Sequence, residues 1–113
     1  MLAWVHRIVQ GDQLRHVARS GTKAPGRLFT ASTVVRGDSD PSRFGFIVSK
    51  QVGGAVVRNL VKRRLRALAA QTLREHPCGM DTVIRAQAPS AGASFDELSV
   101  QWERMVSKTM VAP

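Results

Sequence analysis

A run of basic residues in the middle of the chain is the segment best suited to chemistry. Arg58, Lys62 and Arg66 recur at intervals of four residues, and no acidic residue follows them before Glu75. In an α-helix this spacing places the three side chains on one side, where like charges repel by ~0.2–0.5 kcal/mol per pair. The row is unfavourable unless bound anions neutralise it. We therefore interpret it as a binding surface for a polyanion.

The neighbouring polar residues extend this surface. At about 100° per residue, Asn59 and Arg63 fall on the same side of the helix as the basic row. The apolar positions fall on the opposite arc: Val57, Val61, Leu65 and Leu68. Asn59 supplies an amide that can bond a sugar hydroxyl or a base edge. Arg64 points toward the apolar side, where a long side chain can extend past the core to solvent, so we give it less weight.

The composition of the whole chain agrees with a polyanionic partner. The 113 residues include 17 Lys and Arg against 8 Asp and Glu, a formal net charge of +9. Nucleic acid is the commonest such partner, because each neutralised phosphate releases counterions. A basic amphipathic helix can also lie on an anionic membrane or bind calmodulin. Here, however, the apolar side lacks bulky aromatic residues and is needed for the core of a small domain.

Neither a catalytic cluster nor a metal site is evident. The eight acidic residues form no catalytic pattern, and those in turns and at helix starts are explained by capping. The histidines, His6, His16 and His76, show no metal-ligand spacing with Cys78. Cys78, the single cysteine, lies in a turn-forming stretch and suits a reducing compartment. The sequence predicts a protein without catalytic residues, metal ligands or a small-molecule cofactor of its own.

Targeting and membrane signals are also lacking. His6 and Arg7 interrupt the first apolar stretch, and no small-residue cleavage site follows it, so we expect no signal peptide. No segment approaches the ~20 apolar residues that span a bilayer. We expect a cytoplasmic protein with no membrane partner, forming one domain over residues 1–113.

The expected secondary structure alternates between helices and strands. Helices are predicted over Asp12–Arg19, Ala55 to about Glu75, and Ser94 to about Lys108, and strands over Arg27–Arg36, Arg43–Ser49 and Asp81–Ala86. Within the second strand, alternation places Phe44, Phe46 and Val48 on one face. Ser94 and Glu97 form a capping box for the last helix. The order α-β-β-α-β-α predicts an α+β sandwich, with a small mixed sheet packed against helices.

The central motif resembles the signature of the bacterial ribonuclease P protein family. The matching residues are Phe44-Gly45-Phe46-Ile47-Val48-Ser49-Lys50, Val52-Gly53, Ala55-Val56-Val57-Arg58-Asn59 and Lys62-Arg63-Arg64-Leu65-Arg66. A weaker resemblance extends from Arg7 through the last helix. The resemblance implies a protein without catalytic residues, which binds a large RNA and the 5′ leader of precursor tRNA. The RNA, with bound Mg²⁺, performs the hydrolysis. The implied RNA contacts are Lys50, Arg58, Asn59, Lys62, Arg63 and Arg66.

The resemblance also implies a leader-binding cleft between the first helix and the sheet. The matching positions are Leu14, Ala18, Ser32, Ile47 and Ser49. Phe is usual in the family at the first two positions, and an aromatic residue is frequent at the third. Gln51 stands where a second Lys or Arg is usual. We therefore expect a shallow cleft that relies on charge and apolar contact, since base stacking is worth ~1–3 kcal/mol per base. The family fold further implies a left-handed β-α-β crossover.

Three other functions compete with this interpretation. A ribosomal or other structural RNA-binding protein would explain the charge, but not the joint spacing of Val48-Ser49-Lys50 with Arg58-Asn59. A protein nuclease is opposed by the missing acid–base cluster. A DNA-binding regulator is opposed by the lack of helix-turn-helix spacing.

Overall fold

The computed structural model describes residues 2–110. Its elements are α1 (Gly11–Ser20), β1 (Thr22–Ala24), β2 (Phe29–Val35), β3 (Arg43–Ile47), α2 (Ala55–Leu73), β4 (Met80–Ala86) and α3 (Phe95–Thr109). Two short 3-10 helices, Trp4–His6 and Ala88–Gly92, complete the described part of the chain. The predicted order is confirmed, with β1 as an addition. A strand of three residues is too short for its side-chain alternation to be recognised.

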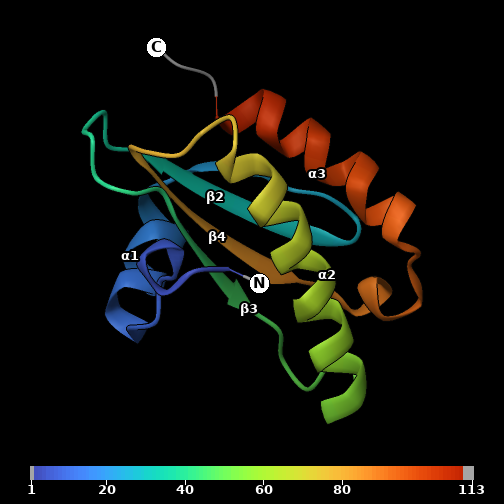
Figure 1. The fold of residues 1–113 in the computed structure, drawn as a ribbon. Helices are drawn as coiled ribbons and strands as arrows, with labels where there is room; N and C mark the ends of the chain where they lie inside the picture. Colours follow the sequence, from blue (N-terminus) through green and yellow to red (C-terminus); the bar gives the residue numbers. More distant parts are fainter. Residues whose placement is uncertain (1, 111–113) are drawn as a thin grey trace.

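The four strands form one mixed sheet in the order β1-β2-β4-β3. β1 pairs with β2, and β2 with β4, in antiparallel fashion, whereas β3 and β4 run parallel. Because parallel neighbours cannot be joined by a tight turn, α2 crosses over one sheet face between them. In Figure 1 this β3–α2–β4 connection is left-handed. The predicted fold class is confirmed.

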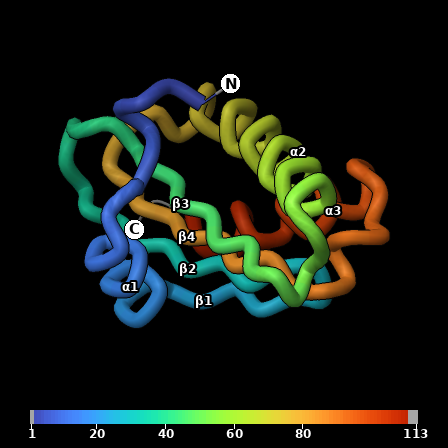
Figure 2. The backbone as a smooth tube through the Cα atoms, turned by 90° about the horizontal axis from the view of Figure 1, so that it is seen from below, coloured from blue at the N-terminus to red at the C-terminus, as the bar shows by residue number. Residues whose placement is uncertain are grey.

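Helices cover both faces of the sheet. α2 and α3 lie on one face and α1 on the other (Figure 2). The larger core lies under α2 and α3 and includes Phe29, Phe44 and Trp102. Trp102 is 3% exposed, and its Nε1 donates a hydrogen bond to Thr72 Oγ1 at 2.8 Å. A tryptophan that fills the core and has its N–H satisfied stabilises the fold and is not free to stack on RNA.

On the other face, α1 lies unusually close to the sheet. A Cβ atom added to Gly21 would lie 2.7 Å from the backbone nitrogen of Thr33, so only glycine allows this approach. A Cβ atom added to Gly45 would lie 2.2 Å from Leu14 Cδ2. Leu14 therefore occupies the space above Gly45. The missing side chains allow the short helix to pack directly on the strands.

The capping box predicted at the start of α3 is confirmed. The Glu97 N–H donates to Ser94 Oγ at 3.1 Å, and the Ser94 N–H donates to Glu97 Oε1 at 3.0 Å. The bond from the Ser94 N–H lowers the pKa of the Glu97 carboxyl. This reciprocal pair satisfies two backbone donors that would otherwise lack partners at the helix start.

Acidic and basic side chains meet near the start of the interior strand β4. Asp81 is buried, and its carboxylate accepts hydrogen bonds from Arg36 Nη1 and from Arg43 Nη2, the latter at 2.8 Å. Arg36 also bonds Asp38 and the carbonyl oxygen of Pro41. The hydrogen bonds to Asp81 raise the pKa of the Arg43 guanidinium. This cluster ties the turn between β2 and β3 to β4.

None of the helices within residues 2–110 combines the length and the apolar character needed to cross a membrane.

Candidate RNA interface

The cationic residues of α2 lie on its exposed side and along the border of its buried side. Its buried residues are Val61, Leu65, Leu68, Ala69 and Thr72. Asn59 and Arg63 point away from them and are exposed, whereas Arg58, Lys62 and Arg66 are half-buried. The basic row thus lies at the border of the buried arc. The prediction from the sequence, that the row lies opposite this arc, is wrong. At 100° per residue, Arg58 lies only about 20° from Leu65, and the buried Ala69 lies about 20° beyond Arg58, so the row begins within the border of the buried arc.

Arg58 and Arg64 lie at the two opposite borders of the buried arc of α2. Arg64 Nη1 donates to the carbonyl oxygen of Ala93 at 2.7 Å, so this side chain ties α2 to the start of α3. Arg58 Nε is buried and finds no hydrogen-bond acceptor among residues 2–110. Arg58 as a whole is only half-buried, so a ligand can approach the exposed part of its side chain. Guanidinium and phosphate groups are geometrically matched for such a contact.

No carboxylate neutralises the cations of α2 within the described residues. Ion pairs form at Arg15, Arg27, Arg36 and Arg43, which all lie outside this helix. The first turn of α2 also lacks an acidic residue. The acidic side chains that make ion pairs are thus used elsewhere in the fold, and the positive charge of α2 remains available to a ligand.

The connector before α2 continues this surface. Ser49, Lys50 and Gln51 are exposed in the turn between β3 and α2. The turn is held by a bond from the Val52 N–H to the Ser49 carbonyl oxygen at 3.1 Å. Lys50 therefore lies on the approach to the amino end of α2, as its place in the motif requires.

The inner candidates for the leader cleft are engaged in packing. Leu14 and Ala18 pack against the smaller core of Ile8, Val17 and Val83. Ser32 is 5% exposed, and its hydroxyl donates to the carbonyl oxygen of Ala18 at 3.1 Å. α1 therefore closes over the sheet at this point.

The outer candidates border an open hollow at the carboxyl ends of β3 and β4. Its volume is about 160 Å³, and its lining includes Ile47, Ser49, Gln51 and Arg85. Arg85 is exposed and is paired in register with Ile47 of β3. Arg85 was not among the residues predicted from the sequence. The available signal was that strand alternation puts Arg85 on the face opposite Ile84.

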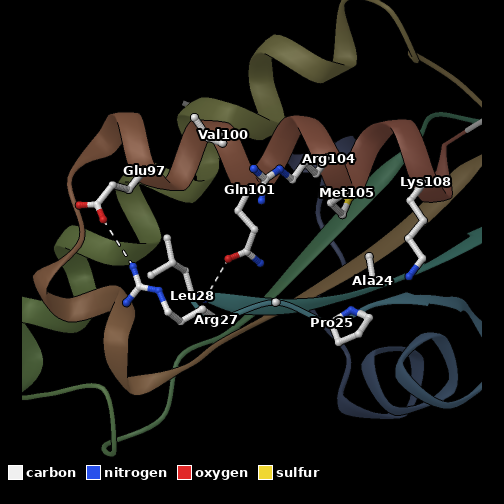
Figure 3. Close-up of a pocket in the computed structure, with 11 residues that line it drawn as sticks. Ala24, Pro25, Arg27, Leu28, Glu97, Val100, Gln101, Arg104, Met105 and Lys108 are labelled. Atoms are coloured by element: carbon white, nitrogen blue, oxygen red, sulfur yellow. Dashed lines mark hydrogen bonds and ion pairs between the residues drawn. The ribbon is translucent and has the colours of Figure 1, made fainter.

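A larger hollow, of about 400 Å³, lies against α3 (Figure 3). It separates α3 from the link between β1 and β2. Arg27 pairs with Glu97 across one end at 3.4 Å, and Gln101 bonds both Leu28 and Phe29 of the backbone. Arg104 and Lys108 line its other part. These cations lie outside the sequence motif, so their removal can serve as a control for removal of the cations of α2.

Comparison with known proteins decides the family. Residues 2–110 match the family model described as Ribonuclease P. The chain belongs to the ribonuclease P protein family. Relatives named ribonuclease P protein component occur in Pseudarthrobacter chlorophenolicus, with 44% identity over 110 residues, and in Kocuria rhizophila, with 46% over 107. The alignments cover 97% and 95% of this chain, and 81% and 94% of those relatives.

Solved ribonuclease P proteins share the fold. The Staphylococcus aureus protein superposes with a TM-score of 0.79 at 24% identity, covering 94% of this chain and 98% of that one. The Thermotoga maritima protein gives a TM-score of 0.73 at 19% identity, covering 95% and 98%. The mixed sheet and its three helices are therefore the architecture of the ribonuclease P protein family.

Metal-binding side chains do not assemble in this ribonuclease P protein. Within residues 2–110, no three His, Cys, Asp or Glu side chains come close enough together to hold a metal ion. His6 instead uses its Nδ1 for a hydrogen bond of 2.6 Å with the carbonyl oxygen of Ser42. Asp81, the buried carboxylate, is occupied by two arginines.

Proposed function

We propose that this chain is the protein subunit of ribonuclease P, which assists a catalytic RNA in removing the 5′ leader from precursor tRNA in the cytoplasm. The supporting observation is the cationic side of α2, which has no carboxylate partner among the described residues. Membership of the ribonuclease P protein family supports RNA as the ligand of this surface. The RNA contacts are the motif residues Lys50, Arg58, Asn59, Lys62, Arg63 and Arg66.

The protein contributes electrostatics and positioning to the reaction. Basic side chains on α2 neutralise phosphates of the RNA subunit, which lets negatively charged strands approach one another. Asn59 supplies a neutral donor and acceptor for a sugar hydroxyl or a base edge. Mg²⁺, bound by the RNA subunit and the substrate, supplies activated water and charge stabilisation at the scissile phosphate.

For the substrate leader, we propose the hollow at the carboxyl ends of β3 and β4. Ile47 and Ser49 border it. Because Leu14 and Ala18 pack with Ile47 against the smaller core, and Ser32 bonds Ala18, we assign these three residues to the closed inner end of the cleft. The hollow offers charge and apolar contact, but none of its lining residues is aromatic. The leader is therefore bound without base stacking at these positions.

Substitution Ala18→Phe tests this view of the cleft. Because Ala18 packs against the smaller core, we expect Phe to overpack it and to lower the free energy of unfolding by ~1–3 kcal/mol. Affinity for precursor tRNA should not improve. Melting temperature, together with binding of substrates with long and short leaders, measures both effects.

His16→Phe is the control, because it adds the same ring at an exposed position of α1. It should leave stability nearly unchanged. A stable Ala18→Phe variant that binds only long-leader substrates more tightly would show that this position opens into the leader cleft.

The RNA-binding role of α2 is tested by Arg58→Ala and Lys62→Ala. Each variant should bind the ribonuclease P RNA more weakly, because one cation no longer displaces a counterion. The slope of log K against log salt should flatten by roughly 0.7–0.9 per variant. Filter binding over a range of salt concentrations gives the slope, and circular dichroism confirms that the fold is retained. Unchanged affinity and slope in both folded variants would mean that this face is only solvated.

A further inference from the structure

The segment before α1 exposes an aromatic side chain. Trp4 is 69% exposed, and its neighbour Val5 is 56% exposed. Trp102, the other tryptophan of the chain, is 3% exposed. Large apolar side chains exposed together mark contact sites, and tryptophan is well suited to them because its flat ring offers a large area at low entropic cost.

Several contacts hold the segment in place. Leu2 is buried in the larger core, and Arg7 Nε donates to its carbonyl oxygen at 2.9 Å. The Arg7 N–H donates to the carbonyl oxygen of Trp4 at 3.1 Å, which closes the short 3-10 helix. The Ile8 N–H bonds the carbonyl oxygen of Phe44 at 2.9 Å. Trp4 therefore lies at the tip of a loop that is closed at its base and anchored to the edge of the sheet.

The same segment forms one wall of a basic pocket. The pocket has a volume of about 150 Å³ and is lined by Leu2 and Arg7 together with Lys62 and Arg66 of α2. Its lining includes three cations and no carboxylate. Four residues of the segment line it, Leu2 before Trp4 and Arg7, Ile8 and Val9 after it. The exposed ring thus belongs to the segment that completes the basic pocket, beside the cationic row of α2.

We propose that this segment is a second RNA contact, in which Arg7, Lys62 and Arg66 bind a phosphate and Trp4 stacks on an unpaired base of the same strand. The proposal rests on the proposed function and extends the interface beyond the motif on α2. A cationic pocket without carboxylates favours a polyanion over a protein partner. Stacking on an aromatic ring requires a base that is free of its neighbours, so the ligand is a single-stranded or looped part of the RNA.

Fluorescence can follow this contact, because Trp102 is shielded in the core. Adding the cognate ribonuclease P RNA to the full chain should change the emission of Trp4. In Trp4→Phe, which retains a stacking ring, the RNA should still bind while the fluorescence change disappears. Trp4→Ala should bind the RNA roughly 5- to 150-fold more weakly, the range that one stacked base contributes.

Val100→Ala is the matched control, because it truncates a 52% exposed apolar side chain on α3. It should bind the RNA as the unmodified protein does. Circular dichroism should show every variant to be folded, since Trp4 contributes little to the core.

The outcomes separate the second contact from the proposed function. If the RNA binds with its normal salt dependence, but Trp4 emission is unchanged and Trp4→Ala binds normally, the second contact is wrong and the role of α2 stands. If the unmodified protein does not bind the RNA at all, the proposed function fails as well. If Trp4→Ala instead dissociates a dimer of the free protein without changing RNA affinity, the exposed ring serves a second copy of this chain, and the second contact is again wrong.

Discussion

Replacing Arg58, Lys62 and Arg66 together by alanine should weaken binding of the ribonuclease P RNA by about 100-fold near physiological salt. Each cation that meets a phosphate adds roughly 0.7–0.9 to the salt slope, and three such contacts account for about two orders of magnitude. The same triple variant should require far more protein to support cleavage. Titration of the RNA at several salt concentrations measures both the affinity and the slope.

A control variant separates the site from the net charge. Arg27→Ala, Arg104→Ala and Lys108→Ala together remove the same formal charge from the hollow beside α3 (Figure 3). This variant should lose less than tenfold, through long-range electrostatics alone. Equal losses in the two triple variants would show that the RNA responds to overall charge and does not recognise the cations of α2.

Asp81→Ala should lower the free energy of unfolding by about 3 kcal/mol. The substitution leaves the partly buried guanidinium groups of Arg36 and Arg43 without their shared carboxylate, and breaking a buried ion pair by removing one partner typically costs 3–5 kcal/mol. We expect the lower end of this range, because Arg36 retains its bonds to Asp38. Urea denaturation followed by circular dichroism gives the value.

Asp12→Ala provides the comparison for Asp81→Ala. It removes an exposed partner of Arg15, and such surface pairs are worth ~0–1 kcal/mol. If Asp81→Ala loses no more stability than Asp12→Ala, the cluster around Asp81 contributes nothing to the stability of the fold. Asp81→Asn, which retains one hydrogen-bond acceptor, should fall between the two.

The sequence predicts best those elements that are long enough to show a full pattern of alternating or helical side chains. In β3, strict alternation correctly places Phe44 and Phe46 toward the larger core and Ile47 toward α1. The capping box at Ser94 correctly marks the start of α3. By contrast, β1 has only three residues and is defined by its pairing with β2, which local sequence does not reveal.

The sequence indicates which residues of α2 form the candidate site, but not which distant segments pack beside them. A helical wheel places Lys62 and Arg66 on one side of α2, yet it does not reveal that they line a pocket together with the segment before α1, which is distant in the sequence. Arg7 reaches the same pocket only through tertiary packing. The cleft positions Leu14 and Ala18 likewise depend on how closely α1 approaches Gly45. Long-range packing of this kind has no local sequence signal.

We propose above all that this protein assists an RNA catalyst through the cationic side of α2. The direct measurement is precursor-tRNA cleavage at low millimolar Mg²⁺ by the cognate RNA alone, by RNA-free protein alone, by both together, and by the RNA with the α2 triple variant. We predict efficient cleavage only for the RNA with the unmodified protein, and little cleavage with the triple variant. Steady cleavage by the RNA-free protein, or cleavage by the RNA that the protein does not increase, would rule out this role for the protein.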